Sequence, residues 1–362
     1  MPSVMANPWR SHGLPGRPGQ DLSVDVGAVR DLLRRCPVAG TTPLHDSPKL
    51  AATLGVEHLW IKDERDRMGL GSFKALGAAY VIAHEADARF GGNWERAPDE
   101  VARALADVTY VTASAGNHGL SVAAGARIFG AKAVIVLSER VSEVFAKRLQ
   151  EFGARVVRAG FDYEESMAIS RRLAEDEGCT LLSDSSWPGY TEIPRQVMEG
   201  YLVMGAEAAE QIDVIADPPT HIFLQAGVGG MAASIAAFAR HQWGNDPVLV
   251  VVEPERAPCL IESIRAGRAV RADGPVSSMR RLDCKEPSHL ALIALARDAD
   301  LFVTISDEEA LETVDFLGEH GIVTTPSGAA GVAAVHNAGP HRRELLLDQW
   351  SRVLTFVSEG HP

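Results

Sequence analysis

The chain has 362 residues, of which 46% are hydrophobic, so it can form one large domain or two of ordinary size around a substantial core. Its 35 basic and 48 acidic residues leave a net charge of −13, and no run of Lys or Arg makes a stripe for a nucleic-acid backbone. No apolar run approaches membrane-spanning length. We therefore expect a cytoplasmic protein that binds neither nucleic acid nor membrane.

The four cysteines lie far apart, without the short spacing of metal ligands or redox motifs, so free thiols and no metal site are expected. Residues 1–20 are rich in Pro and Gly, which predicts a flexible arm without regular structure, or one that packs on a neighbour. A short amphipathic helix is predicted near residues 24–35, and a turn at residues 41–44.

Strands and Ala-rich helical segments alternate in the rest of the chain. The predicted strands are residues 57–62, 108–111, 133–137, 155–157, 180–182, 221–224, 248–252, 301–305 and 354–357. This alternation is typical of parallel sheets covered by helices on both faces, which makes the fold class α/β. No long linker separates two parts, so any second domain must be interleaved with the first.

The segment 71–80 reads GSFKALGAAY and opens a predicted buried helix after the strand at 57–62, which places Lys74 in the first helical turn. A partly desolvated amine loses some preference for its charged form, becomes a better nucleophile and can form a Schiff base with an aldehyde cofactor. The alternative is a lysine that simply extends to solvent.

The loop 112–119, TASAGNHG, joins a strand to a helix. The small residues Ala115 and Gly116 leave backbone N–H groups bare at a helix N-terminus, which suits a substrate carboxylate, and Ser114 adds a hydroxyl donor. The alternative is an ordinary turn with Asn117 as its cap. His118, taken alone, is interpreted as a packed residue rather than a base.

A second loop, QAGVGGM at residues 225–231, again joins a strand to a helix. Glycines at 227, 229 and 230 let the backbone approach a phosphate closely, while the helix dipole favours its charge. The loop lacks the Lys-Ser/Thr pair of a P-loop, so nucleotides fit less well. The alternative is a Gly-rich turn used only for packing.

Two polar residues follow predicted strands. Asp184 comes at the edge of a sheet where α/β sites form, so it can serve as a proton donor, or else merely cap a turn or the next helix. Ser358 follows the last predicted strand, where its hydroxyl can bond a neutral ring nitrogen.

Together these segments resemble the fold type II enzymes that use pyridoxal phosphate, such as threonine and serine dehydratases. The shared features, in the same order, are Ser-Phe-Lys at 72–74, Ser-Ala-Gly-Asn-His at 114–118, the Gly-rich loop at 227–230 and Ser-x-Gly at 358–360. The match covers nearly the whole chain.

Residues 63–77 and 184–201 are most similar to the diaminopropionate ammonia-lyases. One departure is Ala115, because the ammonia-lyases have an aspartate there that is associated with D substrates, whereas threonine dehydratases have a small residue. The resemblance therefore does not carry activity on D substrates over to this chain.

The resemblance implies two interleaved three-layer αβα domains with mostly parallel sheets. Residues 1–77 and 186–362 would form the larger, cofactor-binding domain, and residues 78–185 the smaller domain that closes over the substrate. Relatives of this kind are commonly homodimers, so a homodimer is expected.

The resemblance also assigns roles to the residues above. Lys74 would form the Schiff base with pyridoxal 5'-phosphate, Asn117 would face the ring hydroxyl, and Ser358 would meet the pyridine nitrogen. Asp184 would be the second catalytic residue, protonating the leaving group. The other expected contacts are Gly227, Val228, Gly229 and Gly230 for the phosphate, and Ser114, Ala115, Gly116, Asn117 and His118 for the substrate.

The implied activity is α,β-elimination from a small β-substituted amino acid such as 2,3-diaminopropionate, giving a 2-oxo acid and ammonia. Elimination from L-threonine or L-serine, and β-replacement of the cysteine synthase type, remain alternatives. A non-catalytic ligand-binding protein on the same scaffold is a further alternative, against which an intact Lys74 argues.

Overall fold

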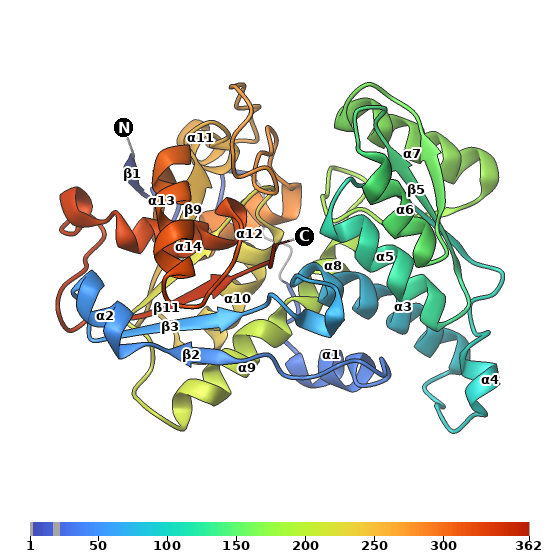
Figure 1. Cartoon of the computed structure of the whole chain (residues 1–362), viewed down its shortest axis with the longest axis horizontal. Coiled ribbons are helices and arrows are strands. Elements are labelled where there is room, and N and C mark those ends of the chain that lie inside the picture. Colours follow the sequence, from blue (N-terminus) through green and yellow to red (C-terminus); the bar gives the residue numbers. More distant parts are fainter. Residues whose placement is uncertain (1–2, 17–21, 362) are drawn as a thin grey trace.

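The computed structural model describes residues 3–16 and 22–361, and Figure 1 shows them as two lobes, each built on its own sheet. The sheets have seven strands in the order β1-β10-β9-β8-β11-β3-β2 and four strands in the order β6-β5-β4-β7. Helices cover the sheets, and most strand pairs are parallel, which confirms the predicted α/β class.

In the larger sheet the inner pairs are parallel, and the edge strands β1 and β2 are antiparallel to their neighbours. Its strands are β1 (Val4–Ala6), β2 (Leu44–Asp46), β3 (His58–Asp63), β8 (His221–Gln225), β9 (Val248–Pro254), β10 (Leu301–Ile305) and β11 (Arg352–Val357). β8 and β10 are buried along their whole length, as expected for strands covered on both faces.

All strands of the smaller sheet pair in parallel. They are β4 (Thr109–Ala113), β5 (Lys132–Leu137), β6 (Arg155–Arg158) and β7 (Thr180–Leu181). These strands fall inside residues 78–185 and those of the larger sheet fall outside. We retain the exact division into residues 1–77 plus 186–362 and residues 78–185 as a proposal.

Helices α3 to α7 belong to the lobe with the smaller sheet in Figure 1: α3 (Lys74–Phe90), α4 (Pro98–Val101), α5 (Asn117–Ile128), α6 (Glu143–Glu151) and α7 (Tyr163–Glu177). The other helices are α1 (Val26–Leu33), α2 (Pro48–Leu54), α8 (Glu192–Gly200), α9 (Leu202–Asp213), α10 (Gly230–Trp243), α11 (Cys259–Ala266), α12 (His289–Asp298), α13 (Asp307–Gly318) and α14 (Pro326–His336). Single 3₁₀ turns lie at η1 (Arg67–Gly69) and η2 (Gly339–His341).

Local sequence explains where helices begin and end. α2 follows Ser47, whose hydroxyl oxygen accepts a hydrogen bond from the backbone N–H of Leu50 at 3.4 Å, and Pro48 occupies its first position. The helix ends at Gly55, whose φ of +65° suits a residue without a side chain.

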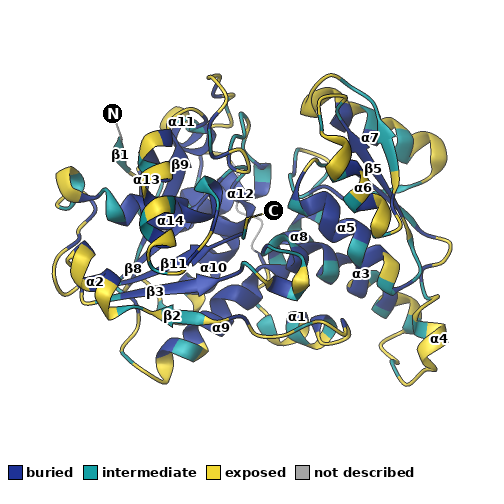
Figure 2. Ribbon diagram, in the orientation of Figure 1, coloured by how far each residue is buried: buried dark blue, intermediate teal, exposed yellow. Residues whose placement is uncertain are grey.

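α10 has buried residues all round its first ten positions because it packs on β8, α8, α9 and α12, in the dark interior of Figure 2.

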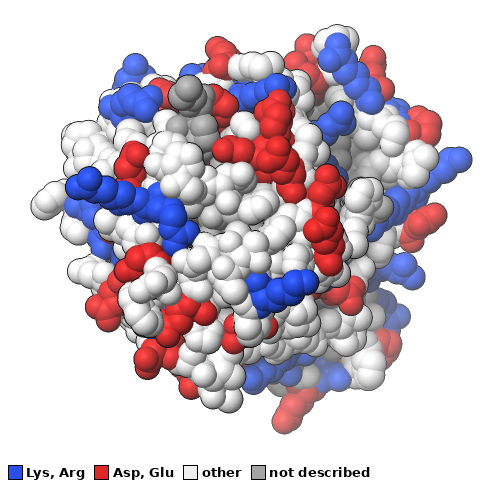
Figure 3. All heavy atoms as spheres, turned by 60° about the vertical axis from the view of Figure 1, so that its left-hand side comes forward, with Lys and Arg blue, Asp and Glu red and all other residues white. Residues whose placement is uncertain are grey.

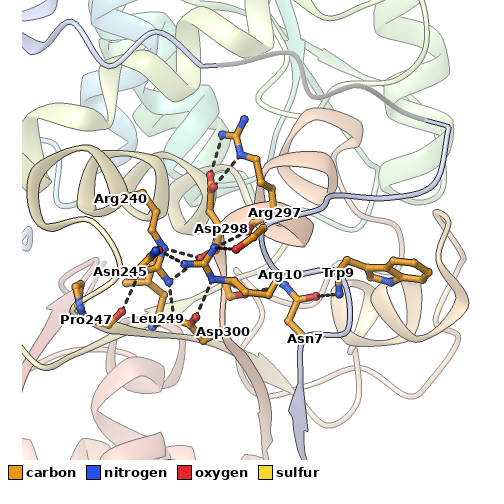
Figure 4. A network of polar contacts seen from close by, with 12 residues as sticks. Asn7, Trp9, Arg10, Arg240, Asn245, Pro247, Leu249, Arg297, Asp298 and Asp300 are labelled. Carbon is orange, nitrogen blue, oxygen red and sulfur yellow. Dashed lines mark hydrogen bonds and ion pairs between the residues drawn. The ribbon is translucent and has the colours of Figure 1, made fainter.

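The N-terminal segment corrects one prediction. Residues 1–20 were expected to lack regular structure, yet β1 pairs with β10 and forms one edge of the larger sheet, with Val4 opposite Val303. The Nδ2 atom of the buried Asn7 then donates to three carbonyl groups at the end of α12, those of Leu295, Ala296 and Ala299. Figure 4 shows this segment beside Arg10, which pairs with Asp300 at 2.8 Å. The prediction is wrong because a short strand fits between Pro2 and Pro8; residues 17–20 lie outside the described residues.

On the face shown in Figure 3, acidic and basic side chains are interspersed, and the basic ones do not join into a band. Among the described residues, no helix combines the length and apolar character that crossing a membrane requires. The four cysteines, all within the described residues, are unpaired thiols.

Candidate active site

Lys74 is the first residue of α3, in the segment that leaves the larger sheet after β3. Its Nζ atom lies 5.2 Å from the ring centre of Phe73 and 5.9 Å from that of Tyr201. The backbone N–H of Phe73 donates to the carbonyl of Ser358 at 3.2 Å, which fixes the start of the helix against the end of β11. The Lys74 side chain is 23% exposed, so the amine is sheltered yet reachable.

Asp184 is the partner of Lys74, with Oδ2 2.5 Å from Nζ. Burial lowers the pKa of Lys74, but the charge of Asp184, the neighbouring Tyr201 and the hydrogen bond to Asp184 together outweigh burial and hold that pKa above its ordinary value. Burial likewise raises the pKa of Asp184, but the charges of Lys74 and His118 and the hydrogen bond to Lys74 together outweigh burial and hold that pKa well below its ordinary value. The prediction that desolvation would weaken the charged amine is therefore wrong in the free protein. In the free protein Asp184 is therefore an ionised carboxylate in direct contact with the Lys74 amine, placed to relay a proton from it.

A buried ionic cluster holds the segment between β3 and α3. The Arg67 guanidinium lies 2.7 Å from both Glu64 and Glu207, and Glu207 lies 2.7 Å from Lys62. These four side chains are at most 5% exposed. Because Glu207 belongs to α9, the cluster fixes the segment between β3 and Lys74 against the rest of the larger lobe.

We expect Glu207→Gln to lower the free energy of unfolding by about 3–5 kcal/mol, since it leaves the two buried cations Lys62 and Arg67 with the single carboxylate of Glu64. Urea denaturation measures the change. Glu210→Gln is the matched control on the same helix, because the Glu210 side chain is 63% exposed and, among the described residues, pairs only with Arg30, so its loss should cost less than about 1 kcal/mol. Equal effects of the two substitutions would contradict the role given to the cluster.

The loop before α5 takes its shape from Ser114. Its hydroxyl oxygen accepts from the backbone N–H groups of Gly116 at 3.3 Å and Gly119 at 3.0 Å. A Cβ at Gly119 would lie 2.7 Å from the Ser114 carbonyl oxygen, so this turn requires glycine. Ser114, not Asn117, is thus the capping side chain; the Asn117 Nδ2 donates instead to the carboxylate of Glu359.

His118 is buried behind this loop. Its Nε2 lies 2.9 Å from the carbonyl oxygen of Leu182, to which it donates, while Nδ1 is buried without a partner among the described residues. Burial lowers its pKa. These contacts fit the interpretation of His118 as a packed residue, and its role in binding substrate stays a prediction.

The Gly-rich loop forms the N-terminus of α10. Gly229 has a φ of +99°, and a Cβ at Gly227 would lie 3.0 Å from the sulfur of Cys284. Within the described residues, the N–H groups of Gly227, Gly229 and Gly230 donate to no acceptor, so they are free to bind an anion such as a phosphate. A Cβ at Gly230 would lie 3.9 Å from the Asp184 carbonyl oxygen, so this loop adjoins the reactive pair.

Ser358 lies at the end of β11 and is 4% exposed. Its hydroxyl makes no hydrogen bond within the part of the chain that is described. The amine of Lys74, the bare amides of the Gly-rich loop and this hydroxyl match the aldehyde, the phosphate and the pyridine nitrogen of pyridoxal phosphate, so the residues present fit that cofactor. The individual roles of the site residues stay predictions.

The structure adds neighbours that sequence reasoning missed. Tyr201 packs beside Lys74, its hydroxyl is buried without a partner among the described residues, and burial raises its pKa to about 12. Burial also raises the pKa of the Cys284 thiol to about 12. Gly77 is a sequence feature that reflects the position of Tyr201, because a Cβ at residue 77 would lie 2.8 Å from the Tyr201 ring. No local motif marks Cys284.

Comparisons with known proteins agree with this geometry. Residues 36–359 match the family model described as pyridoxal-phosphate dependent enzyme. The diaminopropionate ammonia-lyase of Salmonella typhimurium is 31% identical over 355 residues, 90% of this chain and 87% of that protein. The L-threonine ammonia-lyase of Thermotoga maritima is 29% identical, over 83% of this chain and 68% of that protein. The diaminopropionate ammonia-lyase of Escherichia coli, solved in complex with an aminoacrylate-PLP azomethine reaction intermediate, superposes with a TM-score of 0.88 at 27% identity, covering 99% of this chain and 94% of that one.

Proposed function

Because this chain belongs to the family of pyridoxal-phosphate-dependent enzymes, we propose that it removes the β-amino group of a small amino acid of the 2,3-diaminopropionate type and yields a 2-oxo acid and ammonia. The observation that carries the proposal is the contact of Asp184 with Lys74, which places a carboxylate beside the amine so that a proton taken by Lys74 can be relayed to a leaving group. The similarity to diaminopropionate ammonia-lyases supports an amine as the leaving group.

The residues divide the work as follows in this proposal. The amides of Gly227, Gly229 and Gly230 bind the cofactor phosphate, and Ser358 and Asn117 contact its ring. When bound, pyridoxal phosphate supplies an aldehyde for the Schiff base and a conjugated ring that spreads negative charge from Cα.

The loop before α5, Lys74 and Asp184 bind and convert the substrate in this proposal. The amides at the start of α5 and the Ser114 hydroxyl hold the substrate carboxylate. Lys74 takes the Cα proton and passes it to the Asp184 carboxylate in contact with it, and Asp184 gives that proton to the departing nitrogen. A neutral hydroxyl at Ser358 does not keep a positive charge on the ring nitrogen, which favours loss of the β group over reprotonation at Cα.

A second candidate is elimination of a hydroxyl group from L-threonine or L-serine. It is favoured by Ala115, the small residue of the threonine dehydratases, and by the similarity to an L-threonine ammonia-lyase. The same residues would act, with Asp184 protonating a departing hydroxyl.

The test is to incubate the purified holoenzyme separately with L- and D-2,3-diaminopropionate, L-serine and L-threonine, and to assay 2-oxo acid and ammonia. We expect the L-diamine to give the highest kcat/KM, with ammonia released from both of its nitrogens. A higher kcat/KM with L-threonine would favour the second candidate. No 2-oxo acid from any of these substrates would refute both.

Two further properties belong to the proposal. We propose a homodimer, as is common among enzymes of this kind, and a location in the cytoplasm. The net charge of −13 is consistent with a protein dissolved in an aqueous compartment.

A further inference from the structure

A cavity of about 540 Å³ lies next to the candidate active site. Its lining includes Arg148, Arg280, Arg281, Asn117 and Glu359 but not Lys74. Asn117 therefore belongs both to this cavity and to the candidate active site. The cavity is a compartment beside the place of the reaction, not that place itself. Its volume is far larger than a free β-amino group needs.

The lining is strongly cationic. Arg148 comes from α6 in the smaller lobe, whereas Arg280 and Arg281 come from the segment between α11 and α12 in the larger one (Figure 1). Within the described part of the chain, Arg148 and Arg280 form no ion pair. Glu359 is the one carboxylate in the lining, and it already contacts Asn117, Thr325 at 2.5 Å and Arg281 at 3.6 Å.

Arg281 connects this cavity to the substrate loop. Its Nη1 donates to the carbonyl of Ala115 at 3.4 Å, and a Cβ at Gly116 would lie 2.9 Å from the same nitrogen. Its backbone N–H donates to the hydroxyl of Ser327 at 3.1 Å. The guanidinium is thus held beside the residues proposed to bind the substrate carboxylate, which places the cavity next to the proposed substrate position.

Like charges that face each other across a cleft repel, and an anion between them removes that repulsion. Guanidinium groups bind carboxylates through paired, charge-assisted hydrogen bonds. An unmodified 2,3-diaminopropionate brings only its α-carboxylate, which the loop before α5 already serves. Arg148 and Arg280 therefore call for a second anionic group.

We propose that this cavity is a subsite for a carboxylate carried by the leaving amine, so that the preferred substrates are 2,3-diaminopropionates whose β-nitrogen bears a carboxylate-terminated substituent. The inference rests on the proposed elimination. In the reaction Lys74 takes the Cα proton, the electron pair of that bond forms the double bond between Cα and Cβ, and the bond from Cβ to nitrogen breaks with its electron pair going to that nitrogen. Asp184 receives the proton from Lys74 and gives it to the departing nitrogen. The substituted amine leaves with its carboxylate, and the remaining enamine takes up water and gives 2-oxo acid and ammonia.

The test compares two ligands of equal size, the Nβ-carboxymethyl and Nβ-carbamoylmethyl derivatives of L-2,3-diaminopropionate, which differ in the extra negative charge. Calorimetry with the cofactor-loaded Lys74→Ala protein measures binding without turnover. We expect the carboxymethyl compound to bind about tenfold more tightly. Combining Arg148→Gln with Arg280→Gln should abolish this preference, whereas Arg172→Gln, an exposed arginine on α7, should leave it intact.

Equal affinity for the two compounds would overturn the subsite, as would a preference that survives the double substitution. Turnover by the wild-type holoenzyme separates this failure from that of the proposed function. If the charged compound binds preferentially but neither compound gives 2-oxo acid, the subsite stands and the elimination is refuted. If both compounds react with equal kcat/KM and equal affinity, the elimination stands and the subsite is refuted.

Discussion

Lys74→Ala is expected to lower 2-oxo acid formation by at least about 10³-fold, because it removes both the amine that forms the Schiff base and the base that takes the Cα proton. The second readout is absorbance. The wild-type holoenzyme should show a Schiff-base band near ~410 nm, and the variant, mixed with pyridoxal phosphate, should lack it. Loss of both signals together ties the chemistry to this one side chain.

The matched control is Lys132→Ala, an exposed lysine at the start of β5 in the smaller lobe. It should leave both the band and the rate unchanged, within about twofold, since surface substitutions away from the site have small effects. A band that persists in Lys74→Ala would show that another amine carries the cofactor, and the assignment of the site would be wrong.

Asp184→Asn should lower kcat for L-2,3-diaminopropionate by about 10²–10⁴-fold, since an amide of the same shape cannot pass a proton to the departing nitrogen. The same change should act on Lys74 in the cofactor-free protein. Burial lowers the pKa of Lys74, and Asp184 makes the largest of the contributions that raise it. Without the carboxylate, burial remains, and the amine becomes neutral at lower pH.

Two independent measurements, one on the cofactor-free protein and one on turnover, are therefore expected to change in this variant. The pH at which added pyridoxal phosphate begins to form the Schiff base should fall, while kcat falls as well. Asp176→Asn, at an exposed position on α7, serves as the control and should change neither. A kcat within about twofold of wild type would remove Asp184 from the mechanism and leave it as a partner of Lys74 only.

A feature could be predicted from the sequence when the residues that form it lie close together along the chain. The turn around Ser114 and the loop around Gly229 are strand-to-helix connections, so a few consecutive residues determine their conformation. The pairing of Lys74 with Asp184 spans 110 positions and reverses the expected pKa of the lysine. The contact of Arg281 with Ala115 spans 166 positions, and no local sequence pattern predicts it.

The edges of the larger sheet show the same limit. Local reasoning finds strands that are long and apolar, such as β9, because these are buried on both faces. β1 has three residues, two half-buried and one exposed, and it becomes a strand only because β10 offers an unpaired edge to it. Its existence depends on a neighbour almost three hundred residues away, which proline and glycine content cannot reveal.

The place of β11 in the larger sheet bears on the order in which the protein can assemble during synthesis. β11 alone joins β8 to β3, so the sheet is divided into two unconnected halves until residues 352–357 leave the ribosome. The smaller sheet, in contrast, has all its strands once Leu181 has been made. The nascent chain therefore carries open strand edges through most of its translation, the condition under which growing chains aggregate and chaperones engage them.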